Sequence, residues 1–203
     1  MLIVDPIKDI DKIERMKRIL QSQSQRNLLL FVMGINTPLR VNDLLQLKVG
    51  DVLDEDENIL SVISVCRKKT GKCTQIFLND TVKEAMEGYP PLQNERDAAL
   101  FPAWEVYGRQ RNSPKNKIPL SRIQVYRIMR GAAEQAGLSK VGAQTLRKTF
   151  GYQVFQKTGR LKVVQELLNQ DSLSHLTQYI GLKPENPEDM DEAVRRAYLE
   201  LNL

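Results

Sequence analysis

Apolar residues along most of the chain recur at the three- and four-residue spacing of amphipathic helices. In the first stretch, which Asp5-Pro6 opens, this spacing links Ile10, Ile13, Met16 and Ile19. The same pattern, with glycine, proline and capping residues at its breaks, predicts a largely helical chain. The expected helices begin at Asp5 and then cover residues 26–35, 42–47, 80–88, 121–136, 143–157, 162–168, 172–180 and 188–201.

The pattern changes between residues 60 and 78, where β-branched residues dominate two short runs. Residues 60–66 and 73–78 are both rich in strand formers, and the segment between them holds Gly71 among several lysines. This arrangement predicts a β-hairpin with a basic tip. We expect a strand near residues 51–53 to extend it into a small three-stranded antiparallel sheet.

The fold class expected from these elements is α+β, mostly helical, in a single domain over residues 1–182. Pro184 and Pro187 separate this domain from a last helix, so residues 183–203 are expected to form a tail that docks on a neighbouring subunit. A chain of 203 residues with 41% hydrophobic content can bury a core of one-domain size.

Composition narrows the classes of function. Thirty Lys and Arg residues against 25 Asp and Glu give a net charge of +5, which permits a polyanionic partner without requiring one. One histidine and two cysteines are too few for a His-rich metal site or a disulfide framework. There is neither a membrane-length apolar run nor a signal-peptide pattern. We therefore expect a cytoplasmic protein without metal or cofactor, in which Cys66 and Cys73 are free thiols.

Four segments, taken together and in this order, resemble the catalytic domain of tyrosine recombinases, the phage integrase family. They are Thr37-Pro38-Leu39-Arg40-Val41-Asn42-Asp43-Leu44-Leu45, Lys68-Lys69-Thr70-Gly71-Lys72, Gln144-Thr145-Leu146-Arg147-Lys148-Thr149-Phe150-Gly151, and the stretch from Leu167-Leu168 to Thr177-Gln178-Tyr179-Ile180-Gly181. The resemblance covers roughly residues 25–182. Pro38 stands where the family usually has glycine, and Thr177 lies one place late.

The resemblance implies a site that cleaves DNA through a tyrosine. Tyr179 matches the nucleophile, and Arg40 and Arg147, 107 residues apart, match the two arginines that bind the phosphate. Guanidinium forks suit this task because they stay charged and bind phosphate oxygens in a bidentate manner. Lys69 best matches the hairpin lysine that protonates the leaving 5′-oxygen, with Lys72 as the runner-up.

Two positions depart from the family pattern. The first family histidine aligns with Gln144, and the second, a histidine or tryptophan, aligns with Gln170. Glutamine can hydrogen-bond a phosphate oxygen, but it cannot exchange a proton near neutral pH. Loss of a general acid–base group typically slows a reaction about 10²–10⁴-fold. His175, four residues before Tyr179, is expected to be an exposed helix residue without a role.

The resemblance also names the partners. Double-stranded DNA is the expected substrate, bound by a homotetramer on paired sites, without metal or cofactor. Basic residues on a helix face suit contacts with the DNA backbone, but an ordinary solvated face would look the same. The expected contacts are Lys68, Lys72, Arg122, Arg127, Arg130 and Lys148.

Three functions remain open from the sequence. The leading one is site-specific recombination or integration, in a phage or another mobile element, through a covalent 3′-phosphotyrosine. The second is a catalytically impaired, recombinase-like regulator that binds DNA without cutting it, which the two glutamines favour. The third, a monomeric type IB topoisomerase-like enzyme, shares the chemistry. About 24 residues precede the resemblance, so we expect no N-terminal core-binding domain.

Overall fold

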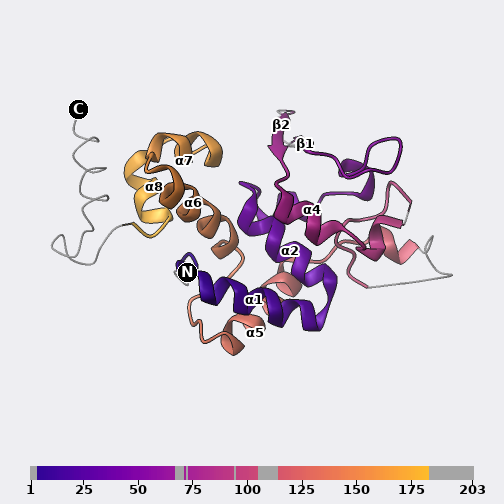
Figure 1. Ribbon diagram of the computed structural model, residues 1–203, viewed down its shortest axis with the longest axis horizontal. Coiled ribbons are helices and arrows are strands. Elements are labelled where there is room, and N and C mark those ends of the chain that lie inside the picture. Colours follow the sequence, from indigo (N-terminus) through magenta and orange to yellow (C-terminus); the bar gives the residue numbers. More distant parts are fainter. Residues whose placement is uncertain (1–3, 67–70, 72, 94, 105–113, 183–203) are drawn as a thin grey trace.

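The computed structural model describes residues 4–66, 71, 73–93, 95–104 and 114–182 (Figure 1). Helices predominate, as predicted, and their order along the chain, with the hairpin among them, is close to the predicted one. The α-helices are α1 (Ile10–Gln23), α2 (Gln25–Asn36), α3 (Val41–Leu44), α4 (Asp80–Met86), α5 (Arg122–Gln135), α6 (Thr145–Thr158), α7 (Leu161–Leu168) and α8 (Leu173–Tyr179). Short 3-10 helices cover Val49–Asp51, Pro90–Gln93 and Pro114–Lys117.

Side-chain caps fix several of these helix starts. Asp9 accepts hydrogen bonds from the backbone N–H groups of Asp11 and Lys12, so α1 begins at Ile10 and not at Asp5 as predicted. An aspartate at this position satisfies N–H groups that have no partner within the helix. Ser121 and Gln124 form a capping box at the start of α5. The residues before Asp9 lie outside the helix and contact α6 instead.

The predicted hairpin is present as β1 (Val62–Cys66) and β2 (Cys73–Phe77), which pair antiparallel with Val62 opposite Phe77 and Cys66 opposite Cys73. The prediction of a three-stranded sheet is wrong for the described residues, where the sheet has two strands. The expected third strand instead folds back on the residues just before β1. Leu53 bridges Ile59, and the Leu60 N–H donates to the Val52 carbonyl.

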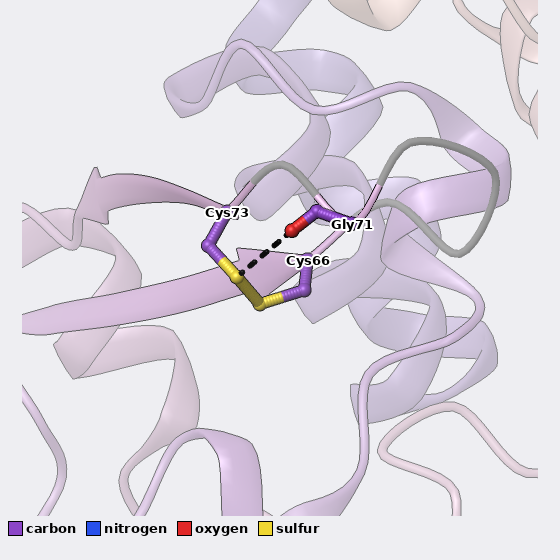
Figure 2. The surroundings of a disulfide bond; sticks show 3 residues. All are labelled: Cys66, Gly71 and Cys73. Atoms are coloured by element: carbon purple, nitrogen blue, oxygen red, sulfur yellow. Dashed lines mark hydrogen bonds between the residues drawn. A yellow bond between two sulfur atoms is a disulfide. The ribbon is translucent and has the colours of Figure 1, made fainter.

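Cys66 and Cys73 form a disulfide, which corrects the prediction of free thiols (Figure 2). The hairpin register places the two cysteines directly opposite each other, with their Cα atoms 3.9 Å apart, so their sulfurs lie within bonding reach. The Gly71 carbonyl oxygen lies 3.7 Å from Cys73 Sγ. Since a disulfide sulfur carries no hydrogen, this approach is a contact and not a donated bond.

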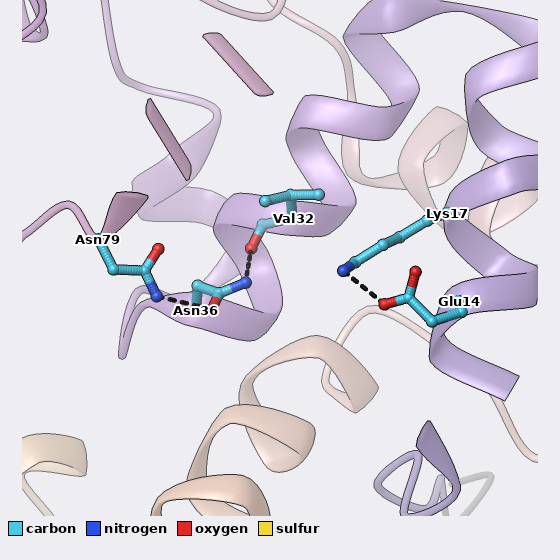
Figure 3. Close-up of polar contacts among 5 residues, drawn as sticks. All are labelled: Glu14, Lys17, Val32, Asn36 and Asn79. Atoms are coloured by element: carbon cyan, nitrogen blue, oxygen red, sulfur yellow. Dashed lines mark hydrogen bonds and ion pairs between the residues drawn. The ribbon is translucent and has the colours of Figure 1, made fainter. Parts of the chain in front are cut away.

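The main core surrounds α2, whose residues are buried along most of its length. Leu29, Leu30, Phe31 and Met33 have no exposed surface, and α1, α4 and α6 all pack on this helix. Polar groups at its end are also satisfied (Figure 3). The Asn36 amide donates to the Val32 carbonyl and accepts from the Asn79 amide, each at 2.9 Å, which joins α2 to the start of α4.

Helices α6, α7 and α8 gather on one side of the molecule, opposite the hairpin and α4 (Figure 1). They enclose a smaller core of their own, built from Phe155, Leu161, Val164, Leu168, Leu176, Ile180 and Leu182. Gly34 of α2 lies directly against Leu146 of α6, a residue of the main core. A Cβ built on Gly34 would lie 2.6 Å from Leu146 Cδ1, so only glycine allows α2 and α6 to approach this closely.

The N-terminal segment Val4–Lys8 crosses α6 as an extended strap. The Ile7 N–H donates to Thr149 Oγ1 at 2.8 Å, and the Lys8 ammonium donates to the Gly181 carbonyl at 2.8 Å. Ile7 itself is buried in the main core. The strap therefore ties the start of the described chain to the helices that end it. Among the described residues, no helix combines the length and apolar character that crossing a membrane requires.

Candidate active site

Except for Lys69, which lies outside the described residues, the residues predicted to catalyse the reaction line one cleft. It has a volume of about 260 Å³ and lies where the start of α3, the start of α6, the α7–α8 connection and the end of α8 meet. These segments are distant in sequence, so the cleft exists only in the folded chain. The predicted residues that line it are Arg40, Gln144, Arg147, Gln170, Tyr179 and Arg122.

Arg147 is the most firmly held of them. It lies in the first turn of α6 and is 5% exposed. Its Nε donates to the Pro38 carbonyl at 2.8 Å, and its Nη2 donates to the Leu168 carbonyl. A guanidinium has five N–H donors, so these two bonds fix its plane and leave other donors for a ligand.

The electrostatic surroundings of Arg147 suit an anion. Burial lowers the pKa of its guanidinium, and the positive charge of Arg40 lowers it further. A hydrogen bond with Tyr179, and the charges of Tyr179 and Asp43, partly oppose this lowering. In the described part of the chain, neither arginine forms an ion pair with a carboxylate. Two neighbouring cations without a carboxylate partner favour a ligand with negative charge.

Arg40 is placed by the helix that follows it. It is the residue before α3, and its backbone N–H donates to Asp43 Oδ2 at 3.2 Å, which closes the first turn. Asp43 thus helps to fix the start of the helix. The Arg40 side chain is exposed, unlike that of Arg147. The site therefore joins one fixed guanidinium with one that solvent reaches.

Tyr179 ends α8 and is half-buried at the cleft. Ser172 begins this helix by accepting a hydrogen bond from the His175 N–H. Behind the tyrosine, the Lys148 ammonium lies 5.2 Å from the centroid of its ring. His175 is exposed and lines a neighbouring cavity that Tyr179 and Lys148 share.

The two glutamines at the family histidine positions, Gln144 and Gln170, lie next to helix ends that border the cleft. Gln144 is the exposed residue before α6, and Gln170 follows the left-handed residue Asn169 that ends α7. Both line the cleft that holds Arg147 and Tyr179. Their amides can donate to or accept from a phosphate oxygen there, whereas proton exchange lies outside their chemistry.

Comparison with known proteins agrees with this geometry. The chain matches the description "Phage integrase family" over residues 8–186. It is 36% identical, over 182 residues, to the probable integrase/recombinase YoeC of Bacillus subtilis (strain 168), with 90% of this chain and 92% of that protein covered. The chain belongs to the phage integrase family.

Solved structures of integrase-family proteins share the fold. A crystal structure of XerA recombinase superposes with a TM-score of 0.68 at 23% identity, covering all of this chain and 67% of that one. A post-cleavage complex of the XerH site-specific recombinase with a palindromic difH substrate gives 0.64 at 21% identity, covering 88% of this chain and half of that one. The chain therefore spans nearly all of YoeC but half to two thirds of these solved chains.

Other predicted residues of this integrase-family chain lie away from the cleft or outside the described residues. Lys68, Lys69 and Lys72 fall outside the described residues, as does the tail over residues 183–203. Arg127 is exposed on α5 and does not line the cleft. Arg130 is paired within α5, with its Nε 2.9 Å from Glu134 Oε1 and its Nη1 2.7 Å from the Tyr126 hydroxyl.

Two features of the site were not anticipated from the sequence. Arg122, expected on a DNA-facing helix, lines the cleft that Arg147 and Tyr179 share, at the start of α5. Lys148, expected at the DNA backbone, instead donates from Nζ to the Val4 carbonyl at 2.7 Å. No periodicity or motif connects residues 4 and 148, so only the fold brings them together.

Proposed function

We propose that this protein is a site-specific DNA recombinase that cleaves and rejoins DNA through a covalent 3′-phosphotyrosine at Tyr179. The observation that carries the proposal is the convergence of Tyr179 with Arg40 and Arg147 around one cleft. Membership of the integrase family supports the same activity. Hydrolysis would need only a bound water, whereas a tyrosine beside two guanidinium groups suits transfer of a phosphoryl group to the protein.

The cleavage step follows from these groups. The Tyr179 hydroxyl attacks the phosphorus of a DNA phosphodiester and loses its proton to solvent, and a bond forms between its oxygen and phosphorus. The bond from phosphorus to the 5′-oxygen breaks, and that oxygen receives a proton. Arg40 and Arg147 stabilise the extra negative charge on the non-bridging oxygens. The phosphotyrosine ester conserves the energy of the broken phosphodiester bond. The reverse attack by a 5′-hydroxyl therefore rejoins the DNA without ATP.

The remaining roles are proposed from the family pattern. Lys69 protonates the leaving oxygen, and Gln144 and Gln170 hold phosphate oxygens by hydrogen bonds. Arg122, Arg127, Lys68 and Lys72 contact the DNA backbone, which fixes register without reading sequence. We place the reaction in the cytoplasm, on duplex DNA, in a homotetramer on paired sites. The difH substrate in the XerH structure supports DNA as the partner.

A second function, a regulator that binds DNA without cutting it, is favoured by one observation. Both positions at which the family supplies a titratable or aromatic side chain are glutamines in the cleft. Without a group to accept the phenol proton, cleavage is expected to be slow by about 10²–10⁴-fold. A protein with chemistry this slow would still recognise the same DNA. The two functions therefore differ in a covalent product and not in affinity.

A selection on randomised, nicked duplex DNA tests the proposal without knowledge of the target site. Bound DNA is recovered once after native washing and once after denaturation, with Tyr179→Phe processed in parallel. A nick beside the scissile phosphate lets the leaving strand diffuse away, which traps the covalent product. The variant lacks only the nucleophilic oxygen, so it controls for binding.

Two outcomes separate the functions. A sequence-enriched pool that survives denaturation with the wild type alone supports the recombinase. Enrichment after native washing only, equal in both proteins, would reject cleavage and leave a DNA-binding regulator. The recovered sequence then supplies the substrate for kinetics.

A further inference from the structure

Lys148 occupies an unusual place for a lysine next to a proposed phosphate site. Its side chain is half-buried, and its ammonium donates to the Val4 carbonyl at 2.7 Å. The same ammonium lies 5.2 Å from the centroid of the Tyr179 ring. A lysine that binds a DNA backbone is expected to extend into solvent, where strands of varying sequence can reach it. Lys148 is directed inward.

Several elements hold the lysine in this position. Lys148 lies in the first turn of α6, directly after the fixed Arg147. Val4 belongs to the N-terminal strap, which the bond from the Ile7 N–H to Thr149 Oγ1 anchors one residue further along α6. The ammonium therefore bridges the strap and the end of α8. Its position is set by three parts of the fold and does not depend on bound DNA.

The Lys148 ammonium lies within cation–π distance of the tyrosine ring. A cation over an aromatic face is attracted by the ring, and it attracts the ring more strongly once the oxygen gains negative charge. Burial lowers the pKa of the Lys148 ammonium, and the carboxylate of Asp5 opposes this effect. Partial burial also reduces screening by water, which strengthens the interaction with Tyr179.

We propose that Lys148 is a positioning residue for Tyr179. Its ammonium, tethered to the strap, holds the ring beside Arg147 and stabilises the negative charge that the phenol oxygen acquires as it attacks. This inference rests on the proposed function, because it assumes that Tyr179 is the nucleophile. It replaces the expectation that Lys148 contacts the DNA backbone. Lys148 neither takes the phenol proton nor forms a bond to the substrate.

Two substitutions separate the charge from the tether. Lys148→Gln keeps a hydrogen-bond donor for the Val4 carbonyl but removes the charge, and Lys148→Arg keeps the charge. Lys148→Met supplies a second neutral variant if the amide disturbs packing. Lys157→Met, an exposed position in the last turn of the same helix, controls for the loss of one positive charge from α6.

The first measurement needs no DNA. Tetranitromethane nitrates tyrosine through its ionised form, and peptide mass spectrometry gives the rate for each tyrosine separately. Tyr126 lines the same cavity as Tyr179 and Lys148, so it reports any general opening of that region. We expect Lys148→Gln and Lys148→Met to slow nitration of Tyr179 at least threefold and leave Tyr126 unchanged. Lys148→Arg and Lys157→Met should match the wild type.

Other nitration results would overturn the proposal. An unchanged rate at Tyr179 in both neutral variants would mean that the ammonium does not act on the tyrosine. Faster nitration of Tyr126 and Tyr179 together would mean that Lys148 only holds the strap in place. Both results can be read whether or not the protein cleaves DNA, so a failure here is distinct from a failure of the recombinase proposal.

The second measurement uses nicked DNA recovered from the selection. At saturating DNA, we expect Lys148→Gln to slow formation of the covalent product about tenfold or more, with an unchanged Kd and Lys148→Arg restoring most of the rate. If Lys148 instead contacts a DNA phosphate, the substitution should give the opposite result: weaker binding and an unchanged rate at saturating DNA. The slope of log affinity against log salt concentration should then also fall by about one. That result would overturn the proposal and show that Lys148 contacts the DNA backbone.

Discussion

The guanidinium of Arg147 donates a hydrogen bond to the backbone carbonyl of Pro38, 109 residues earlier in the chain. Pro38 stands in the segment that leads to Arg40, so this bond joins the two loci that supply the arginines of the cleft. The backbone carbonyl of a proline accepts a hydrogen bond as well as that of a glycine does. The bond therefore explains how Pro38 can replace the usual family glycine without loss of this contact.

Substitution of either arginine by lysine should impair cleavage, but only one should impair folding. Arg147→Lys loses its bonds to Pro38 and Leu168, and Arg40→Lys loses no side-chain bond that the structure describes. We expect both variants to lower the rate of covalent product formation about 10²–10³-fold. Arg147→Lys should also lower the free energy of unfolding by about 1–3 kcal/mol, because buried carbonyls lose their partner. Equal stability of the two variants would argue against this anchoring role.

Gly151 should tolerate no larger side chain, because helices α7 and α8 pack directly on it. A Cβ at this position would lie 2.7 Å from Ile180 Cγ2 and 2.9 Å from Leu168 Cδ1. Overpacking of about 1–3 kcal/mol exceeds the gain in helix propensity of up to about 1 kcal/mol, so Gly151→Ala should be destabilised by about 1 kcal/mol. Because Ile180 follows Tyr179, cleavage should also slow.

Gly131 of α5 is the matched control for this substitution. A Cβ built there meets nothing within 4 Å, so Gly131→Ala should gain about 0.5–1 kcal/mol in urea unfolding. The expected changes in the free energy of unfolding therefore have opposite signs in Gly151→Ala and Gly131→Ala, and this difference tests the packing. If both variants gained stability, the close packing of α8 on α6 would be incorrect.

The sequence predicted the helices well because their apolar spacing and caps are local signals. Ser121 and Asn79, for example, cap α5 and α4 at the predicted starts. The start of α1 was misplaced because Asp5-Pro6 and Asp9 carry similar start signals, and only packing of the strap on Thr149 decides between them. The third strand failed for a comparable reason, since strand propensity cannot specify which segment pairs with which.

The site was predictable to the extent that motifs carry it. Arg40, Arg147, Gln144, Gln170 and Tyr179 were all named from three of the four sequence patterns, and they line one cleft. The direction of Lys148 was not predictable, because its partners lie 144 and 31 residues away and belong to no motif. Its basic character alone suggested a phosphate contact. Position within the fold, and not residue type, assigns it to the tyrosine.

The disulfide between Cys66 and Cys73 should contribute measurably to stability. It closes a short loop, with a sequence separation of seven, and a cross-link of this kind typically adds about 2–3 kcal/mol by limiting the unfolded chain. Cys66→Ser/Cys73→Ser should therefore lower the free energy of unfolding by about that amount. Wild type treated with a thiol reductant should fall to the same value, and the double variant should not respond. Two titratable thiols per chain in protein purified without reductant would contradict the disulfide.

Gln144→His should accelerate cleavage, because the substitution places a titratable imidazole beside the arginines and the tyrosine of the cleft. A group that exchanges protons near neutral pH supplies what glutamine cannot, and we expect at least about a tenfold faster formation of the covalent product. The pH–rate profile should gain a dependence centred near the free imidazole value of about 6.5. Gln135→His, at the exposed end of α5, is the matched control and should leave the rate unchanged. An unchanged rate in Gln144→His, with DNA affinity intact, would mean that proton transfer does not limit this reaction.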